Sequence, residues 1–283
     1  MIRLGGPATC EAPGASRPGL APATRRRRQQ ASRMAAMPPY REGVARPATR
    51  STEDSAGGTR MAKLWVLLER KPELSMADFE AWWLEHVKLS SRMPGLSRYR
   101  INFVREVRPF GVDLPTVRFD GTAELQFASD AEMAVAFRSD VATAAVADTD
   151  RVCSRRIEFA TDEHVVVPGP SMRDEAIVKV AVLLWRQPEL STDSFRDWWF
   201  EHVQQSRLMP GLRGYRINFV NDVRGNGFAA EEFACDGTAE LWFDNLEAVE
   251  AGFGSAIGQS AAEDAARHCQ RRVRYLTAEH VVI

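Results

Sequence analysis

The sequence is poor in the features that mark several common classes of protein. Its four cysteines have no paired spacing, which argues against a disulfide framework and is typical of free thiols in a reducing compartment. No apolar run approaches the roughly 18 residues of a transmembrane helix, and a net charge of −1 gives no reason to expect nucleic acid as a partner. We therefore expect a cytoplasmic protein that binds neither a membrane nor nucleic acid.

Metal-binding and nucleotide-binding motifs are equally scarce. The five histidines form no His-x-x-x-His pattern, and the sequence has no cysteine cluster. Gly225 and Gly227 are not followed by a helical pattern, so they do not form a phosphate-binding loop. We expect no metal ion and no nucleotide cofactor.

The first sixty residues differ in composition from the rest of the chain. They contain eleven arginines, no lysine and four acidic residues, so they carry a charge near +7 while the remainder is near −8. With one aromatic residue and few aliphatic ones, this segment buries too little apolar surface to offset the entropy of ordering, and we expect a disordered tail over 1–60. The run Arg25–Arg28 leaves open a basic arm or an organelle transit peptide. A third alternative is that the native protein starts at Met61.

An internal repeat determines the expected architecture. Residues 63–167 align without a gap with 179–283, at a constant offset of 116, and about half of the positions are identical. Each copy has the length of a small domain, and a segment rich in turn-forming residues separates them. We therefore expect domains at 61–168 and 177–283, joined by a linker at 169–176.

Within each copy the pattern predicts strand, helix, strand, strand, helix, strand, which is the order of the ferredoxin-like split βαβ motif. One such sheet leaves an apolar face uncovered, and a second copy can cover it. The sequence thus predicts an α+β protein in which two tandem ferredoxin-like domains form an intramolecular dimeric α/β barrel, in a chain that is a monomer or a homodimer. The expected elements of the first copy are strands at 64–68, 99–104, 122–127 and 157–167, helices at 75–92 and from 129 onward, and a variable loop at 108–119.

Four motifs in each copy resemble the EthD domain of the dimeric α/β-barrel superfamily. In the first copy they are Trp-Trp-x-Glu-His-Val at 82–87, Met-Pro-Gly-Leu-x-x-Tyr at 93–99, Asp-Gly-Thr-Ala-Glu-Leu at 120–125 and Glu-His-Val-Val at 163–166. The resemblance implies the barrel fold and no built-in metal or flavin. Members of this family include isomerases of aromatic compounds and tailoring enzymes of polyketide pathways, and a general oxidoreductase description is common among them.

The histidine of the repeated helix is the leading candidate for chemistry. On a helix His86 shares about one third of the circumference with Phe79 and Trp83, and it is the only ionisable group in that apolar arc. A neutral imidazole there can act as a general base or acid, but it can equally be a buried histidine with a structural hydrogen bond. In the resembled isomerases this histidine and the tyrosine after the Pro-Gly turn lie at the active site. The residues that the resemblance assigns to catalysis are His86, Tyr99, His202 and Tyr215.

Further candidates surround the histidine in the sequence. Strand alternation places Tyr99 and Asn102 on opposite faces of the sheet. A buried carboxylate such as Glu124 could orient His86 and raise its basicity, although an ion pair elsewhere is the alternative. Five tryptophans at positions 65, 83, 185, 199 and 242 could wall a cavity for aromatic ligands, or fill the core. The residues expected to bind substrate are Trp83, Trp199, Asn102, Asn218, Glu124, Glu240, His164 and His280.

These observations favour an enzyme that needs no cofactor and acts on a small hydrophobic, aromatic or polyketide-like compound by acid–base chemistry of histidine and tyrosine. Isomerase, decarboxylase and oxidoreductase reactions all remain open. One alternative is a small-molecule-binding or stress-response protein without turnover. Another is haem-dependent oxidation, because haem enzymes exist on related barrels.

Overall fold

The computed structural model describes residues 61–111, 119–170, 177–227, 233 and 235–283. The tail expected at 1–60, and most of the linker expected at 169–176, lie outside these residues. The elements are, in chain order, β1 (Ala62–Arg70), α1 (Met76–Ser90), β2 (Leu96–Gly111), β3 (Gly121–Phe127), α2 (Asp130–Ala136), α3 (Asp140–Val152), β4 (Cys153–Val167), β5 (Val178–Arg186), α4 (Thr192–Ser206), β6 (Leu212–Asn226), β7 (Gly237–Phe243), α5 (Leu246–Gly254), α6 (Ala256–His268) and β8 (Cys269–Val281).

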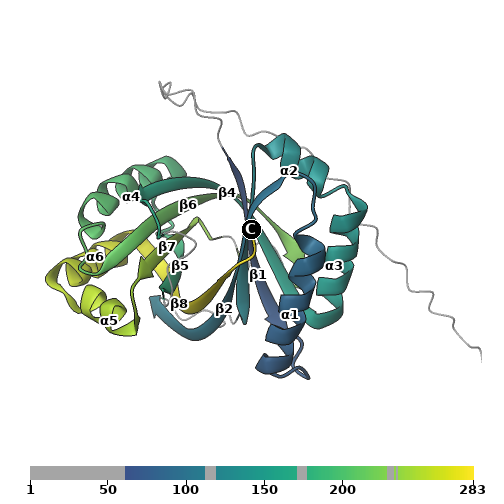
Figure 1. Ribbon diagram of the computed structural model, residues 1–283. Helices are drawn as coiled ribbons and strands as arrows, with labels where there is room; N and C mark the ends of the chain where they lie inside the picture. The colour runs from purple at the N-terminus through teal and green to yellow at the C-terminus, as the bar shows by residue number, and fades with distance from the viewer. Residues whose placement is uncertain (1–60, 112–118, 171–176, 228–232, 234) are drawn as a thin grey trace, which may run out of the picture. The chain divides into compact units, whose positions relative to one another are not determined.

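The eight strands form one closed antiparallel barrel in the order β1-β3-β2-β8-β5-β7-β6-β4. Each half contributes four neighbouring strands, and the pairs β2–β8 and β4–β6 join the halves along two seams. Helices α1–α3 cover the strands of the first half and α4–α6 those of the second (Figure 1). The predicted fold, two ferredoxin-like halves closing a barrel within one chain, is confirmed.

The seam strands are longer than the sequence pattern indicated. We expected a variable loop from residue 108, but β2 continues to Gly111, which pairs with Arg271 of β8. The last strand of the first half begins at Cys153 rather than near 157. The end of β2 pairs with β8 of the other half, whereas the start of β4 pairs with β1 of its own half at Arg70 and Glu69. Such pairing between distant segments cannot be read from local sequence.

Each predicted second helix is in fact two helices. The break after α2 is made by Ser139, whose side-chain oxygen accepts a hydrogen bond from Ala142 N at 3.2 Å and caps α3. Ser255 caps α6 in the same way through Gly258 N at 3.0 Å. An N-cap residue has extended backbone, so the chain changes direction there, and α3 can pack along α1 while α2 stays over β3.

Strand alternation gives each half two different faces. Leu64 and Val66 pack beneath the helices, whereas Lys63 and Trp65 face the barrel interior. Ala181, the repeat equivalent of Trp65, lies in the same interior cluster, so a large and a small side chain pack together across the barrel.

The five tryptophans therefore do not wall one cavity. Trp83 and Trp199 lie beneath the helices, whereas Trp65, Trp185 and Trp242 lie inside the barrel. The differences between the copies at these interior positions concern packing of the barrel core.

Candidate functional site

Helix α1 carries the candidate histidine to the sheet. Ser75 caps the helix by accepting a hydrogen bond from Asp78 N at 3.1 Å. The helix then buries Phe79, Trp83 and His86 against the strands. His86 is 8% exposed, so its ring is almost completely removed from water.

Asp148 of α3 is the direct partner of His86. Its Oδ2 lies 2.8 Å from His86 Nδ1 and accepts a hydrogen bond from Trp82 Nε1 at 2.9 Å. Its other oxygen accepts from Arg151 Nη2 at 2.7 Å. One carboxylate thus joins α1 to α3 and fixes the imidazole ring.

The second half repeats this arrangement. His202 Nδ1 lies 2.8 Å from Asp264 Oδ2, and Trp198 Nε1 donates to the same oxygen at 2.9 Å. Arg267 Nη2 donates to Asp264 Oδ1 at 3.1 Å. The sequence-based prediction did not include either aspartate. The offset of 116 and the Asp-x-x-Arg pattern that Asp148 and Asp264 share could have indicated them.

Burial and hydrogen bonding set the charge state of this pair. Burial lowers the pKa of His86 below its usual value, against the opposing effect of Asp148. Burial raises the pKa of Asp148, but hydrogen bonds from Arg151, His86 and Trp82 outweigh it and leave that pKa lowered. The pair is therefore a neutral imidazole and a carboxylate at neutral pH. Because a carboxylate only accepts hydrogen bonds, Nδ1 carries the ring proton and Nε2 keeps a free lone pair.

A cavity of about 60 Å³ lies between the helices and the sheet of the first half. Its lining includes the sequence-predicted residues His86, Tyr99 and Trp83, together with Arg156 and Glu158 of β4. The volume holds a few water molecules and is well below the roughly 300–1,000 Å³ of typical ligand pockets. A larger ligand therefore requires side chains of the lining to move.

Tyr99 supplies the second polar group of this cavity. Its hydroxyl lies 3.1 Å from Ser90 Oγ, which is also 3.1 Å from the main-chain oxygen of His86. Burial raises the pKa of Tyr99, with Ser90 and Trp83 acting in the opposite direction. The phenol is therefore protonated at neutral pH and able to donate a hydrogen bond.

Trp83 explains the glycine of the Asp-Gly-Thr-Ala-Glu-Leu motif. A Cβ on Gly121 would lie 2.0 Å from Trp83 Cζ3 and 2.9 Å from the main-chain oxygen of Asn102. The equivalent Cβ on Gly237 would lie 2.3 Å from Trp199 Cζ3. Each indole packs directly on a glycine backbone, which fixes the wall of the site.

Asn102 and Glu124 lie on the other face of the sheet, inside the barrel. Asn102 Nδ2 donates to Glu124 Oε1 at 3.1 Å, and Asn218 Nδ2 donates to Glu240 Oε1 at 2.9 Å. Both glutamates also form ion pairs with the two lysines buried in the barrel. The carboxylate beside His86 is therefore Asp148 and not Glu124.

His164 and His280 lie at the seams between the halves and are exposed. His164 packs on Phe200 and Phe219 of the second half, with ring centroids 5.0 and 5.5 Å away. In the other seam His280 is opposite Ile101. Neither histidine lines the cavity that contains His86.

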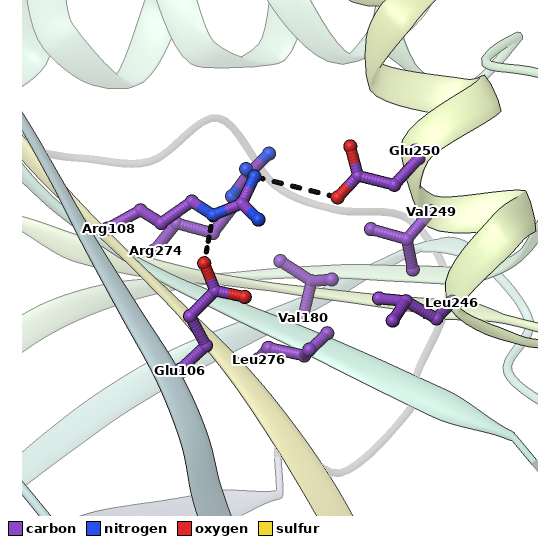
Figure 2. Close-up of a pocket in the computed structure, with 8 residues that line it drawn as sticks. All are labelled: Glu106, Arg108, Val180, Leu246, Val249, Glu250, Arg274 and Leu276. Carbon is purple, nitrogen blue, oxygen red and sulfur yellow. Dashed lines mark hydrogen bonds and ion pairs between the residues drawn. The ribbon is translucent and has the colours of Figure 1, made fainter.

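Figure 2 shows a second hollow, where the end of β2 meets β8 and α5. Its walls include Val180 and Leu276, and Arg108 forms ion pairs with Glu106 and Glu250 across it. With a volume of about 10 Å³ it has room for roughly one water molecule. We therefore do not assign it to a substrate.

The described residues contain neither a metal-ligand cluster nor a membrane-spanning helix. No group of three or more His, Cys, Asp or Glu side chains there is arranged to hold a metal ion. No helix in that part of the chain has both the length and the apolar character needed to cross a bilayer.

The closed barrel of two ferredoxin-like halves, with helices on its outer face, defines the class as a dimeric α/β barrel formed within one chain. The EthD domain family matches residues 71–153 and 187–270, once in each half. The chain belongs to the EthD domain family.

An anthrone oxidase-like protein of solved structure shares this fold, and two other solved proteins are similar to part of the chain. An anthrone oxidase-like protein has 12% identity and a TM-score of 0.54, covering 79% of this chain and 93% of its own. An EthD family protein from Bacillus halodurans has 20% identity and a TM-score of 0.28, covering 38% of this chain and 97% of its own. A dimeric protein with a ferredoxin-like fold from Bacteroides fragilis has 13% identity and a TM-score of 0.29, covering 38% and 98%. No curated protein sequence matches the chain. The fold is one that catalytic and small-molecule-binding proteins use, and it specifies no single chemistry.

Proposed function

We propose that the chain is an enzyme that moves a proton on a small hydrophobic carbonyl or phenolic compound, with His86 as the base. The observation that carries this proposal is the shared cavity: His86, whose ring is held by Asp148, and Tyr99 line the same space. The apolar side chains around them favour an aromatic or polyketide-like substrate over a sugar or a nucleotide.

In the proposed reaction His86 Nε2 takes a proton from a carbon next to the substrate carbonyl. The imidazolium that forms is stabilised by Asp148 at 2.8 Å. Tyr99 donates a hydrogen bond to the oxygen on which negative charge develops. Return of the proton to another carbon gives an isomer, and no electrons leave the substrate.

Proton transfer can be tested before the natural substrate is identified. The full chain is incubated in D₂O with a panel of hydrophobic aromatic carbonyl compounds that includes an anthrone, and deuterium incorporation is followed by mass spectrometry. Exchange is expected to fall about 10²–10⁴-fold in His86→Ala, the usual contribution of a general base. Tyr99→Phe tests the hydrogen-bond donor, and His202→Ala is the matched control for the second half.

Unchanged exchange in a folded His86→Ala/His202→Ala double variant would falsify the proposal. The alternative, a binding protein without turnover, predicts a ligand that binds and is released without deuterium. Native mass spectrometry of the same mixtures separates the two functions.

A further inference from the structure

One wall of the His86 cavity carries polar groups that the proposed proton transfer does not use. This wall is formed by α3 and β4, and its polar lining residues are Thr149, Arg156 and Glu158. Arg156 Nη1 donates a hydrogen bond to Glu158 Oε1, and each side chain is only 10% exposed. A buried ion pair therefore lines the same space as His86 and Tyr99.

The internal repeat shows that this wall is particular to the first half. Lining residues that have the same identity in both copies include Trp83, His86, Ser90, Met93, Tyr99 and Leu125. The copies differ in polarity at two lining positions: Thr149 corresponds to Ala265, and Glu158 corresponds to Arg274. The chemical difference between the halves thus lies at the polar wall.

The second half also shows that the fold does not require the ion pair. Arg274, in place of Glu158, lies over the ring of Phe253 at 4.5 Å and lines the hollow in Figure 2. Helix α6 and strand β8 nevertheless form as α3 and β4 do. Burial of an ion pair costs desolvation energy and is weak evidence for stability. The pair of Arg156 with Glu158 therefore points to a role toward the molecule that occupies the cavity.

The balance of charge at this wall favours a hydrogen-bond donor. Arg156 pairs with Glu158 and its Nε lies 3.4 Å from Asp150 Oδ1, so two carboxylates surround one guanidinium. Carboxylates only accept hydrogen bonds, and this surplus of acceptors disfavours an anionic group. Arg156 occupies Oε1 of Glu158, so the same carboxylate can accept a further hydrogen bond at Oε2.

We propose that Glu158 accepts a hydrogen bond from a hydroxyl group of the substrate and that Arg156 positions the carboxylate for this contact. The substrate class is then a hydroxyaryl ketone, with its carbonyl oxygen at Tyr99 and its hydroxyl at the polar wall. A site built to bind a hydroxyl group discriminates strongly against an analogue that lacks it. The second half, with Arg274 at this position, does not recognise that group. This inference rests on the proposed function, because it takes the His86 cavity as the substrate site.

The test compares matched neutral probes in calorimetric titrations of the full chain. The probes are phenylacetone, its three isomers with one hydroxyl group on the ring, and the corresponding methoxy compounds. A methoxy group keeps the oxygen atom but has no hydrogen to donate. The best hydroxylated isomer is expected to bind about tenfold or more tightly than both its methoxy counterpart and phenylacetone.

Two variants of the first half should reduce this preference. Arg156→Met/Glu158→Leu removes the pair without leaving a buried charge unpaired, and the preference should disappear. Glu158→Gln keeps the shape of the side chain but replaces a charged acceptor by a neutral one, so the preference should fall severalfold. Arg272→Met/Arg274→Leu, the matched change in the second half, should preserve it. The melting temperature of each variant checks folding.

The proposal is overturned if no hydroxylated isomer binds, or if the hydroxy and methoxy probes bind equally. It is also overturned by an unchanged preference in either folded variant of the first half, or by its loss in the matched variant of the second. Deuterium exchange of the same probes separates this inference from the proposed function. Exchange that depends on His86 without a preference contradicts the hydroxyl contact alone, whereas a preference without exchange contradicts proton transfer alone.

Discussion

Asp148 determines which nitrogen of His86 is available for chemistry. The carboxylate binds Nδ1 at 2.8 Å and so directs the free lone pair to Nε2. It also accepts from Trp82 and Arg151, which keep it ionised and in place. The residue therefore has two effects that can be separated by experiment, one on the pKa of the imidazole and one on its tautomer.

Replacing Asp148 by Asn should lower the pKa of His86 further. Burial already lowers it below 6.5, and the substitution removes a hydrogen bond and a charge that act in the raising direction. NMR titration of the imidazole resonances measures both proteins, with Asp264→Asn as the matched change for His202. A wild-type His86 that titrates above 6.5 contradicts the assignment.

The same pKa shift predicts how stability depends on pH. The unfolded chain binds a proton near pH 6.5, whereas folded His86 binds it only at lower pH, so the unfolded state holds more protons between these values. This contribution to stability is complete above pH 6.5 and is lost as the pH falls toward the folded pKa. Urea midpoints measured from pH 7.5 to 5 should decrease, and the decrease should be smaller in His86→Gln.

Gly121 should not tolerate even a methyl group. The added Cβ would lie 2.0 Å from Trp83, so the indole or the strand must shift. We expect Gly121→Ala to cost about 1–3 kcal/mol of unfolding free energy, as overpacking typically does. In Gly254→Ala, where nothing lies within 4 Å, stability should be unchanged or slightly higher. Chemical denaturation of both variants gives the comparison.

The cavity residues show what the sequence could and could not predict. The repeated motifs and the resemblance to the EthD domain singled out His86, Trp83 and Tyr99 as site residues. The structure places all three around one cavity. Asp148 was missed because its contact with His86 spans 62 residues and depends on how α3 packs on α1. Glu124 was the wrong partner for His86, because strand parity directs it into the barrel.

Helix α3 keeps the cavity open because its inner face carries small side chains. Ala142 and Ala145 line the space on that face, with Thr149 one turn further along. The sequence did not predict this helix as a separate element, since the break at Ser139 is a cap and not a proline or a glycine. The depth of the cavity could therefore not be predicted from the pattern.

Ala145→Leu should fill the cavity and block the proposed reaction. The isopropyl group enters a space of about 60 Å³ beside His86, so the fold can accommodate it while a ligand cannot. We expect deuterium exchange to fall by at least tenfold with a change in melting temperature of a few degrees. Ala261→Leu, the equivalent change in α6, is the control and should leave exchange by the first half intact.

A buried network of charges links the two halves across the barrel. Lys63 lies 2.7 Å from Glu163 Oε2 and also pairs with Glu240 of the second half. Lys179 of the second half pairs with Glu124 of the first half, and its Nζ lies 3.2 Å from Glu240 Oε2. The repeat predicted the barrel correctly, but this cluster could not be predicted because its partners lie up to 177 residues apart.

Removing one member of this network should lower the free energy of unfolding. Lys63→Met leaves buried carboxylates without their counter-charge, and the loss of one partner from a buried ion pair costs about 3–5 kcal/mol. In the double variant Lys63→Met/Glu240→Gln part of that loss should be recovered, because one of the uncompensated charges is gone. Urea denaturation of the wild type, the two single variants and the double variant gives a double-mutant cycle. Lys88→Met, at a lysine whose side chain is 69% exposed, is the control. Full additivity of the two changes argues against a direct pair.

The pseudo-twofold arrangement of charges predicts how one half behaves alone. A fragment of residues 61–170 exposes the face of the sheet that carries Lys63, Trp65 and Glu124. In a symmetric pair of fragments Lys63 of one copy would meet Glu124 of the other, because Glu124 occupies the position that Glu240 has in the second half. We expect a homodimer by light scattering after size exclusion, weakened in the Lys63→Met fragment and unaffected in the Lys88→Met fragment. A folded monomeric fragment would show that closure of the barrel depends on features outside the repeated network.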